Sequence, residues 1–368
     1  MNKTLRFVVA TLMLCSGSAF SGVEDNIKIG GFASAAYAVS DSEDVYSERI
    51  DEDGSWDETR LALNISAKIS NKLSFAGQIL MAGRENNFDA HADWAFGRYK
   101  FSDTTSVLFG KIKYPSTLFS EFYDVGYLYP WSSTPQELYN LEVGGSGAVY
   151  ESVKGASLLF TMMPDEIEYV FQPFVGNADM EDGTMKKLVG FMVGANGDNF
   201  QVKVGYNKGE FHPGGGHGDG GEEGEEGIFH DFDDETPDKE TWNFGASGEL
   251  GNLVGYVEYA RIKYDGFSGL DTDAGYATLG YRINKFLPHI TFASFEQDNG
   301  REQESVTLGV KYALTDNASL KVDWSVIDTQ PPEEDDGEGW HGIEATGLFF
   351  DGTDDEVNIV YLTLDVLF

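Results

Sequence analysis

The sequence has almost no cysteine, few basic residues and no long hydrophobic run. Its 368 residues include one cysteine, Cys15, which excludes a disulfide framework and any cysteine-rich metal site. The 25 Lys and Arg residues stand against 62 Asp and Glu residues, for a net charge of −37. Nucleic-acid binding requires basic surfaces that displace counterions from phosphates, so this charge argues against a nucleic-acid partner. No stretch of the sequence reaches the roughly 18 consecutive apolar residues of a transmembrane helix.

The first 21 residues have the features of a secretory signal peptide. A positively charged start precedes the uncharged residues 7–15, and Ala19 and Ser21 supply the small residues of a cleavage site. The apolar stretch is too short to span a bilayer. We therefore expect residues 1–21 to be removed and residues 22–368 to leave the bacterial cytoplasm. A lipoprotein acylated at Cys15 is disfavoured, because the residue before this cysteine is a large leucine.

Hydrophobicity alternates with a period of two through most of the remaining chain. In residues 60–69 the apolar side chains occupy every second position, and residues 305–312 and 320–326 repeat the pattern. Successive side chains of a β-strand point to opposite sides, so each segment predicts a strand with one apolar and one polar face. Each segment is about ten residues long, the length that crosses a bilayer at a tilt. Helical periodicity is nearly absent outside residues 113–145.

The pattern predicts sixteen strands joined by alternating short and long connections. The connections after even-numbered strands are tight and rich in Gly, Asn and Asp, whereas several of those after odd-numbered strands are long. A transmembrane barrel has such short turns at one end and long loops at the other, and a soluble β-sandwich gives no reason for the alternation. The expected strands are 27–39, 57–70, 73–82, 91–101, 105–113, 155–163, 167–176, 186–196, 199–210, 241–250, 253–264, 274–283, 287–297, 302–313, 318–328 and 357–368.

The last predicted strand ends on an aromatic residue. Apolar side chains alternate from Val360 to the terminal Phe368. In an exported chain, this pattern resembles the terminal strand by which bacterial outer-membrane proteins are recognised during assembly, so Phe368 is the predicted assembly signal. The predicted fold class is all-β, an antiparallel transmembrane β-barrel of about 16 strands occupying residues 22–368.

These features together resemble the Gram-negative outer-membrane porin superfamily across the whole mature chain. One local segment is similar to the constriction-loop region of one porin-like subfamily, namely residues 110–115 followed by Ser120, residues 124–127, Pro130, Pro135, Glu137 and Tyr139. The resemblance implies a third loop folded into the lumen, a homotrimer in the outer membrane of a Gram-negative bacterium, and small hydrophilic solutes as partners. It also implies contact with outer-membrane lipid, lipopolysaccharide and the outer-membrane assembly machinery. It implies no cofactor, and it does not carry over a substrate preference.

The predicted pore constriction combines acidic side chains of the third loop with basic side chains of the wall. Residues 114–154 are rich in aromatic rings, whose burial is favourable by about 1.5–3 kcal/mol each, so this loop is expected to pack into the barrel. Acids facing bases would select solutes by size and charge. The acidic candidates are Glu121, Asp124, Glu137 and Glu142. Strand alternation gives the basic candidates Arg60, Lys111, Lys113, Lys203, Arg282 and Lys321, with Lys68 and Lys311 nearer the turns and less central.

Two outer loops, residues 211–240 and 329–356, are strongly acidic. The first also contains His212, His217 and His230. Carboxylates bind Ca²⁺ or Mg²⁺, and histidine beside carboxylate binds Zn²⁺, but a glycine-rich loop offers no fixed geometry. Solvated surface loops are therefore the favoured interpretation, and no metal site is predicted.

The sequence favours a channel over an enzyme. Residues 216–221 satisfy the G-x-G-x-x-G pattern without the strand-to-helix context of a dinucleotide site, and no other catalytic motif occurs. A passive porin is the predicted function, because sixteen strands enclose a lumen wide enough for water. Two alternatives remain, a substrate-specific channel in which the aromatic loop forms a binding track, and a surface adhesin or receptor that uses the acidic loops.

Overall fold

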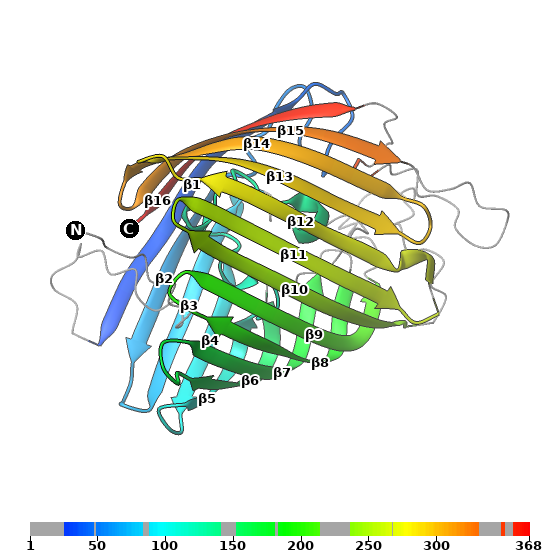
Figure 1. The fold of residues 1–368 in the computed structure, drawn as a ribbon. Coiled ribbons are helices and arrows are strands. Elements are labelled where there is room, and N and C mark those ends of the chain that lie inside the picture. Colours follow the sequence, from blue (N-terminus) through cyan, green and yellow to red (C-terminus); the bar gives the residue numbers. More distant parts are fainter. Residues whose placement is uncertain are drawn as a thin grey trace.

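The computed structural model describes residues 26–47, 49–83, 88–140, 152–180, 183–213, 236–266, 268–330, 347–349 and 356–368. In this part of the chain, sixteen antiparallel strands form one closed barrel in which sequence neighbours pair and β1 pairs with β16 (Figure 1). The predicted fold class and strand number are thereby confirmed. The strands are β1 (Ile27–Ser40), β2 (Arg60–Lys68), β3 (Leu73–Ala82), β4 (His91–Lys100), β5 (Thr105–Lys113), β6 (Ser152–Met162), β7 (Glu168–Met180), β8 (Gly183–Asn196), β9 (Phe200–Pro213), β10 (Asp238–Leu250), β11 (Leu253–Tyr264), β12 (Thr272–Tyr281), β13 (Phe286–Gln297), β14 (Glu302–Thr315), β15 (Ala318–Gln330) and β16 (Val357–Leu367).

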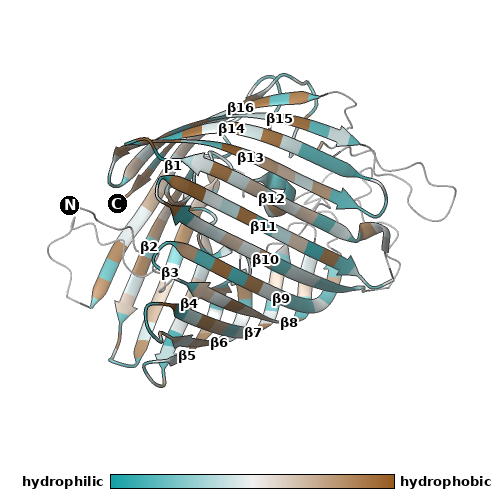
Figure 2. Ribbon diagram, viewed as in Figure 1, coloured by the Kyte–Doolittle hydropathy of each residue, from teal (hydrophilic) through white to brown (hydrophobic). Residues whose placement is uncertain are grey.

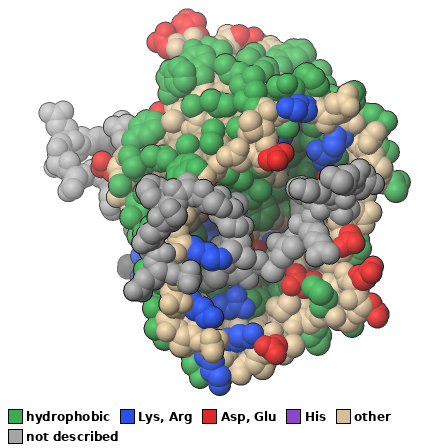
Figure 3. All heavy atoms as spheres, turned by 90° about the vertical axis from the view of Figure 1, so that its left-hand side faces the viewer, with side chains coloured by type: hydrophobic (Ala, Val, Ile, Leu, Met, Phe, Trp, Pro, Cys, Tyr) green, Lys and Arg blue, Asp and Glu red, His purple; other side chains and the backbone are tan. Residues whose placement is uncertain are grey.

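Tight turns join the strands at one end of the barrel. β10 ends at Leu250 and β11 begins at Leu253, and β14 and β15 are equally close. These turns lie at the left of Figure 1, where β1 begins and β16 ends, as an even strand number requires. Figure 3 looks onto this end, where Lys and Arg side chains gather at the lower left and Asp and Glu side chains at the right.

The outer face of the barrel is apolar, as the alternation predicted. On β2, Leu61 and Ile65 are each 41% exposed while Arg60 and Ala62 between and beside them are buried. Figure 2 shows the same alternation of hydrophobic and hydrophilic residues along many strands. Aromatic side chains continue this surface from β6 to β11, with ring pairs such as Tyr206 and Trp242, whose centroids are 4.6 Å apart. An apolar belt of this kind fits the hydrocarbon region of a bilayer.

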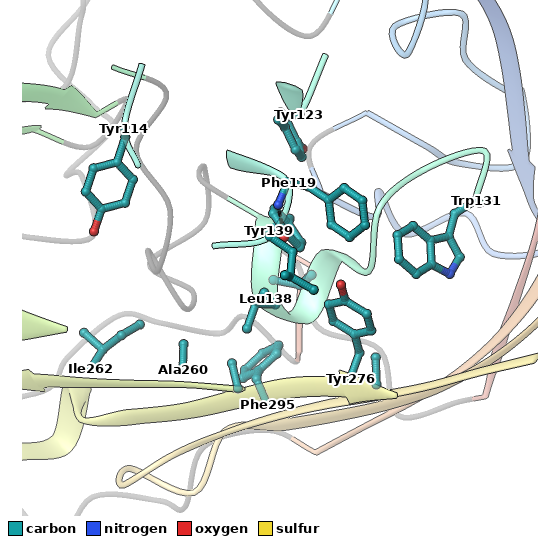
Figure 4. Close-up of a cluster of buried hydrophobic side chains, with 14 of the residues drawn as sticks. Tyr114, Phe119, Tyr123, Trp131, Leu138, Tyr139, Ala260, Ile262, Tyr276 and Phe295 are labelled. Carbon is teal, nitrogen blue, oxygen red and sulfur yellow. Dashed lines mark hydrogen bonds between the residues drawn. The ribbon is translucent and has the colours of Figure 1, made fainter. Parts of the chain in front are cut away.

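The connection between β5 and β6 enters the barrel, and its residues 114–140 are called the inner loop below. It contains the short helices η2 (Ser120–Phe122), η3 (Gly126–Leu128) and α1 (Gln136–Tyr139), while η4 (Ser268–Leu270) joins β11 to β12. Inner-loop side chains and inward-facing strand side chains together form the main hydrophobic cluster (Figure 4). Among the described residues, no helix is long and apolar enough to cross a membrane.

Candidate functional site

The beginning of the inner loop lies against β9, β10 and β11. The Lys203 ammonium donates to the Thr117 carbonyl at 3.1 Å, and the Asn243 amide donates to the Ser116 hydroxyl at 2.5 Å. The backbone of Ser116 can approach β9 because the facing residue is Gly205, where a Cβ would lie 2.7 Å from the Ser116 Oγ. Polar groups of the wall thus replace the water that would otherwise solvate this backbone.

Glu258 on β11 joins the beginning and the end of the inner loop. Its carboxylate accepts the Leu118 N–H at 2.7 Å and the Tyr276 hydroxyl at 2.6 Å, and it also accepts the Tyr139 hydroxyl. Burial, followed by the nearby Glu258 charge, raises the pKa of Tyr139 well above its ordinary value, so this phenol keeps its proton and donates. The buried Glu258 carboxylate therefore has a donor for each of its oxygens.

The middle of the inner loop lies against the opposite wall, formed by β14, β15, β16 and β2. The Lys321 ammonium donates to the Gly126 and Trp131 carbonyls at 2.5 and 2.6 Å and pairs with Asp365 at 2.9 Å. Arg60 donates to the Tyr129 hydroxyl at 2.5 Å, and Lys311 donates to the Tyr127 and Tyr129 carbonyls. Wall bases therefore bind main-chain oxygens of the inner loop.

The last part of the inner loop is held by β13, β14 and β15. The Trp131 indole donates to Thr291 at 2.8 Å, and the Ser132 N–H donates to Asp323 at 2.6 Å. Glu137 accepts a hydrogen bond from Gln303 at 2.9 Å. The beginning of the loop binds β9, β10 and β11, and its middle binds β14, β15, β16 and β2. The inner loop therefore crosses the barrel interior.

Aromatic rings fill the space between these polar anchors (Figure 4). The Phe119 ring lies at the centre, with ring centroids 5.4 Å from Trp131 and 6.4 Å from Tyr139. Tyr123 stacks on Tyr139 at 5.6 Å, and Tyr276 of β12 meets Trp131 edge-on at 5.3 Å. Edge-to-face pairs at these separations stabilise by about 0.5–1.5 kcal/mol each beyond their burial. The rings therefore fix the shape of the inner loop as well as its position.

Two of the four acidic candidates lie beside wall bases. Glu121 pairs with Lys203 at 3.0 Å, and Asp124 pairs with Lys113 at 3.3 Å. Glu137 is buried and bonded to Gln303. Glu142 lies outside the described residues. Glu121 and Asp124 therefore form direct ion pairs with Lys203 and Lys113, and do not face these bases across an opening.

Of the six basic candidates, four contact the inner loop, and Arg282 and Lys111 do not. Arg60, Lys113, Lys203 and Lys321 contact the inner loop, as described above. Arg282 lies just after β12 at the turn end, is 45% exposed, and pairs with Glu249 at 2.7 Å.

The inward placement of Lys111 is wrong. Leu108 and Ile112 on β5 both belong to the inner hydrophobic cluster, so Lys111 between them shares the outer face with Phe109, which is 49% exposed. Its ammonium donates to the Ala92 carbonyl on the neighbouring strand. Lys113 has the same parity but is the last residue of β5, and its ammonium reaches Asp93 and Asp124. β5 is apolar on its inner face because it packs against the inner loop, and this reverses the usual pattern of polar residues inside.

Several residues of this site are absent from the sequence-based candidates. Asp93 pairs with Lys113 at 2.9 Å, Asp365 pairs with Lys321, and Glu258 and Asp323 accept main-chain N–H groups of the inner loop. All four are acidic residues in strands. Glu258, Asp323 and Asp365 alternate with outward apolar residues, a spacing that indicates the inner face, whereas Asp93 lies at an irregularity in the pairing of β3 with β4 that the alternation does not indicate. Among the described residues, no three His, Cys, Asp or Glu side chains lie together as a metal site would require. Most of the two acidic outer loops lies outside the described residues.

A closed sixteen-stranded barrel with an apolar outer belt and a loop fixed across its interior defines a β-barrel channel of the outer-membrane type. The chain belongs to the Gram-negative porin family, because the family model matches residues 8–330. No curated protein sequence matches it.

Several solved structures share the fold. OmpF of Salmonella typhi, in complex with daunomycin, aligns with a TM-score of 0.57 at 15% identity over 93% of this chain and 98% of its own. The anion-selective porin of Comamonas acidovorans aligns at 0.55 with 14% identity over 93% and 99%. OmpT of Vibrio cholerae, an outer-membrane protein, aligns at 0.56 with 13% identity over 94% and 99%. At these identities the likeness shows the fold alone.

Proposed function

We propose that the chain forms a water-filled channel for passive diffusion of small hydrophilic solutes and ions, with the inner loop as its size-limiting element. The observation that carries this proposal is the position of the inner loop, which is bound to Glu258 on one wall and to Lys321 on the other. A loop fixed at both walls narrows the lumen without requiring a moving part. The fold and family favour a channel over an enzyme.

Purified chain reconstituted into a planar lipid bilayer tests the proposal. Passive diffusion predicts stepwise openings with a linear relation between current and voltage, and the same current in the presence or absence of sugars or organic acids too large to enter. Absence of openings from folded protein would contradict the proposal.

A substrate-specific channel is the second candidate, and the aromatic cluster favours it. Phe119, Trp131 and Tyr139 are themselves buried, but Phe122 of the inner loop and Tyr256 of the wall pack against this cluster and stay partly exposed. Exposed rings of this kind stack on sugar faces and bind cations. The same bilayer recordings separate the two candidates. Concentration-dependent block by one class of solute at low concentration would favour the specific channel.

We further propose that residues 1–21 direct export and that residues 22–368 insert into the outer membrane of a Gram-negative bacterium as a homotrimer surrounded by lipid and lipopolysaccharide. Membership of the porin family supports this placement. The apolar outer faces of β1, β2 and β16 provide surface for lipid or for a neighbouring subunit.

Deletion of Phe368 should reduce the amount of assembled protein in the outer membrane several-fold. The Phe368 N–H donates to the Gly31 carbonyl at 3.0 Å, and its own carbonyl accepts the Gly31 N–H at 2.8 Å, so the terminal residue helps to close β16 onto β1. Quantitative immunoblotting of outer-membrane fractions measures the effect, with Leu362→Ala as an apolar control elsewhere on β16. Equal amounts of the deleted and intact chains would argue against Phe368 as an assembly signal.

The channel should prefer cations weakly at low salt. The whole chain carries a net charge of −37, and two of the wall bases, Lys113 and Lys203, are already paired with Asp124 and Glu121. Exposed charge acts over a Debye length of about 8 Å at physiological ionic strength, so the preference should decrease as salt is raised. Reversal potentials in KCl gradients measure it. Anion selectivity at low salt would show that the remaining bases dominate.

A further inference from the structure

A buried histidine and a buried aspartate face each other on the inner wall of the barrel. His289 on β13, Gly309 on β14 and Asp323 on β15 are consecutive partners in the sheet. A Cβ on Gly309 would lie 2.1 Å from the Asp323 Oδ1 and 2.3 Å from the His289 Cε1. The two side chains therefore meet above a residue that has no side chain of its own.

The contact between His289 and Asp323 is incomplete. The His289 Nε2 lies 3.5 Å from the Asp323 Oδ1, and their side chains are 0% and 2% exposed. Among the residues that the structure describes, neither His289 ring nitrogen nor the Asp323 Oδ1 has a hydrogen-bond partner. Buried polar groups are ordinarily hydrogen-bonded, and in this pair both the base and the acid have an atom without a partner.

The other oxygen of Asp323 holds the inner loop. The Asp323 Oδ2 accepts the Ser132 N–H at 2.6 Å, next to Trp131, whose carbonyl binds Lys321. Asp323 also lines a cavity of about 30 Å³ between the loop and the wall, together with Thr307 and Ser325. The cavity leaves room beside the carboxylate, whereas His289 itself does not line it.

Charged side chains surround this pair on the wall and on the inner loop. They are Arg282 with its partner Glu249, Lys311, Lys321, Asp323 and Asp365, with Arg60 near Lys321 and Asp365, and Glu137 of the inner loop, which lines the same cavity as Asp323. Tyr256 on β11, Tyr361 on β16 and Tyr127 and Tyr129 of the inner loop complete the titratable groups there. A proton on His289 adds one positive charge to this set, and Asp323 is the carboxylate directly in its reach.

We propose that His289 and Asp323 form a proton-dependent anchor for the inner loop. Imidazole changes its charge between pH 5 and 8 in general. At the acidic end, a proton from water binds the imidazole, whose N–H then donates to the free Asp323 Oδ1. Charge-assisted hydrogen bonds are roughly twice as strong as neutral ones. The carboxylate is then fixed by His289 on one side and by the Ser132 N–H on the other, and the Trp131–Ser132 segment is held more firmly.

Hydrogen exchange of the full chain in detergent micelles tests this anchor. The Ser132 amide exchanges only when it separates from Asp323, so its protection reports how often the anchor opens. After correction for the intrinsic pH dependence of exchange, the protection of peptides covering Ser132 should be about tenfold higher at pH 5 than at pH 8, the ratio that one charge-assisted hydrogen bond supplies. Equal protection at the two pH values would overturn the proposal.

Three variants test whether the pH dependence of Ser132 protection comes from His289 and Asp323. His289→Gln should remove the pH dependence while the barrel still forms. Asp323→Asn should remove it too, because the asparagine oxygen still accepts the Ser132 N–H but carries no charge for the imidazolium. His212→Gln, at the end of β9, should keep the full pH dependence. Persistence of the pH dependence in His289→Gln would overturn the proposal.

The effect of the anchor on current rests on the proposed channel function. In bilayer recordings, transient closures should be about tenfold rarer at pH 5 than at pH 8 in the unchanged chain and equally frequent at both in His289→Gln. If the chain forms no channels, the proposed function is wrong. The hydrogen-exchange measurement would still test whether His289 and Asp323 anchor the inner loop.

Discussion

Deletion of residues 116–140, with β5 and β6 kept intact, should raise the single-channel conductance at least about twofold and admit larger solutes. The reason is that this segment crosses the barrel interior, between Glu258 on one wall and Lys321 on the other. A sixteen-stranded barrel without an inserted segment leaves a wider aqueous lumen. Liposome swelling with sugars of increasing size measures the exclusion limit, and bilayer recordings measure the conductance.

The matched control deletes residues 214–235 from the acidic connection between β9 and β10. This change removes a similar length of chain and should leave the size limit unaltered. Wall charges such as Lys321 become hydrated once the inner loop is gone, so the deletion leaves no charge both buried and unpaired. Unchanged conductance and exclusion after removal of 116–140 would place the narrowest point of the channel elsewhere.

The strands could be predicted from the sequence because the membrane and the lumen impose opposite demands on alternate residues. In β2, Leu61, Leu63 and Ile65 point outward and Arg60 points inward, as the period of two required. Neither the strand count nor the alternation of turns and loops depends on distant contacts. A short segment of sequence therefore suffices to identify each strand.

The same rule fails where the inner loop fills the barrel. Leu108 and Ile112 on β5, and Phe295 on β13, are apolar and point inward because they pack on an inner hydrophobic cluster. When the inner face of a strand is apolar, alternation alone assigns that face to the lipid and the opposite face to the lumen, and for this reason it predicts an inward Lys111. The sequence of β5 alone does not say that a loop covers it.

The partners of the inner loop could not be predicted, because they lie far away in the chain. Lys321 binds the carbonyl of Gly126, and Asp323 binds the N–H of Ser132. The path of the inner loop determines which wall residues its main chain meets, and that path follows from the packing of the aromatic cluster. Alternation identified Lys321 and Lys203 as inward-facing bases, but their contacts with main-chain carbonyls of the loop follow only from the structure.

Lys321→Met should lower the stability of the barrel by about 3–5 kcal/mol, the usual cost of leaving one partner of a buried ion pair alone. Lys321 is fully buried, and its ammonium binds Asp365 as well as the Gly126 and Trp131 carbonyls. Methionine has a similar length and supplies none of these bonds. Asp365 would keep the Ser34 hydroxyl, 2.6 Å away, but would lose its cationic partner. Chemical denaturation followed by tryptophan fluorescence measures the change.

Two further variants show whether the lost charge pair causes the loss of stability. Lys100→Met removes a pair with Asp103 in which the two side chains are 43% and 96% exposed, and exposed pairs contribute about 0–1 kcal/mol. It should therefore change stability little. The double variant Lys321→Met with Asp365→Asn removes both charges, so it should recover part of the stability that Lys321→Met loses. If the double variant is no more stable than Lys321→Met, the buried charge on Asp365 is not the cause, and the lost bonds to the inner-loop carbonyls account for the whole effect. If Lys321→Met is as stable as the unchanged chain, Lys321 does not hold the inner loop to the wall.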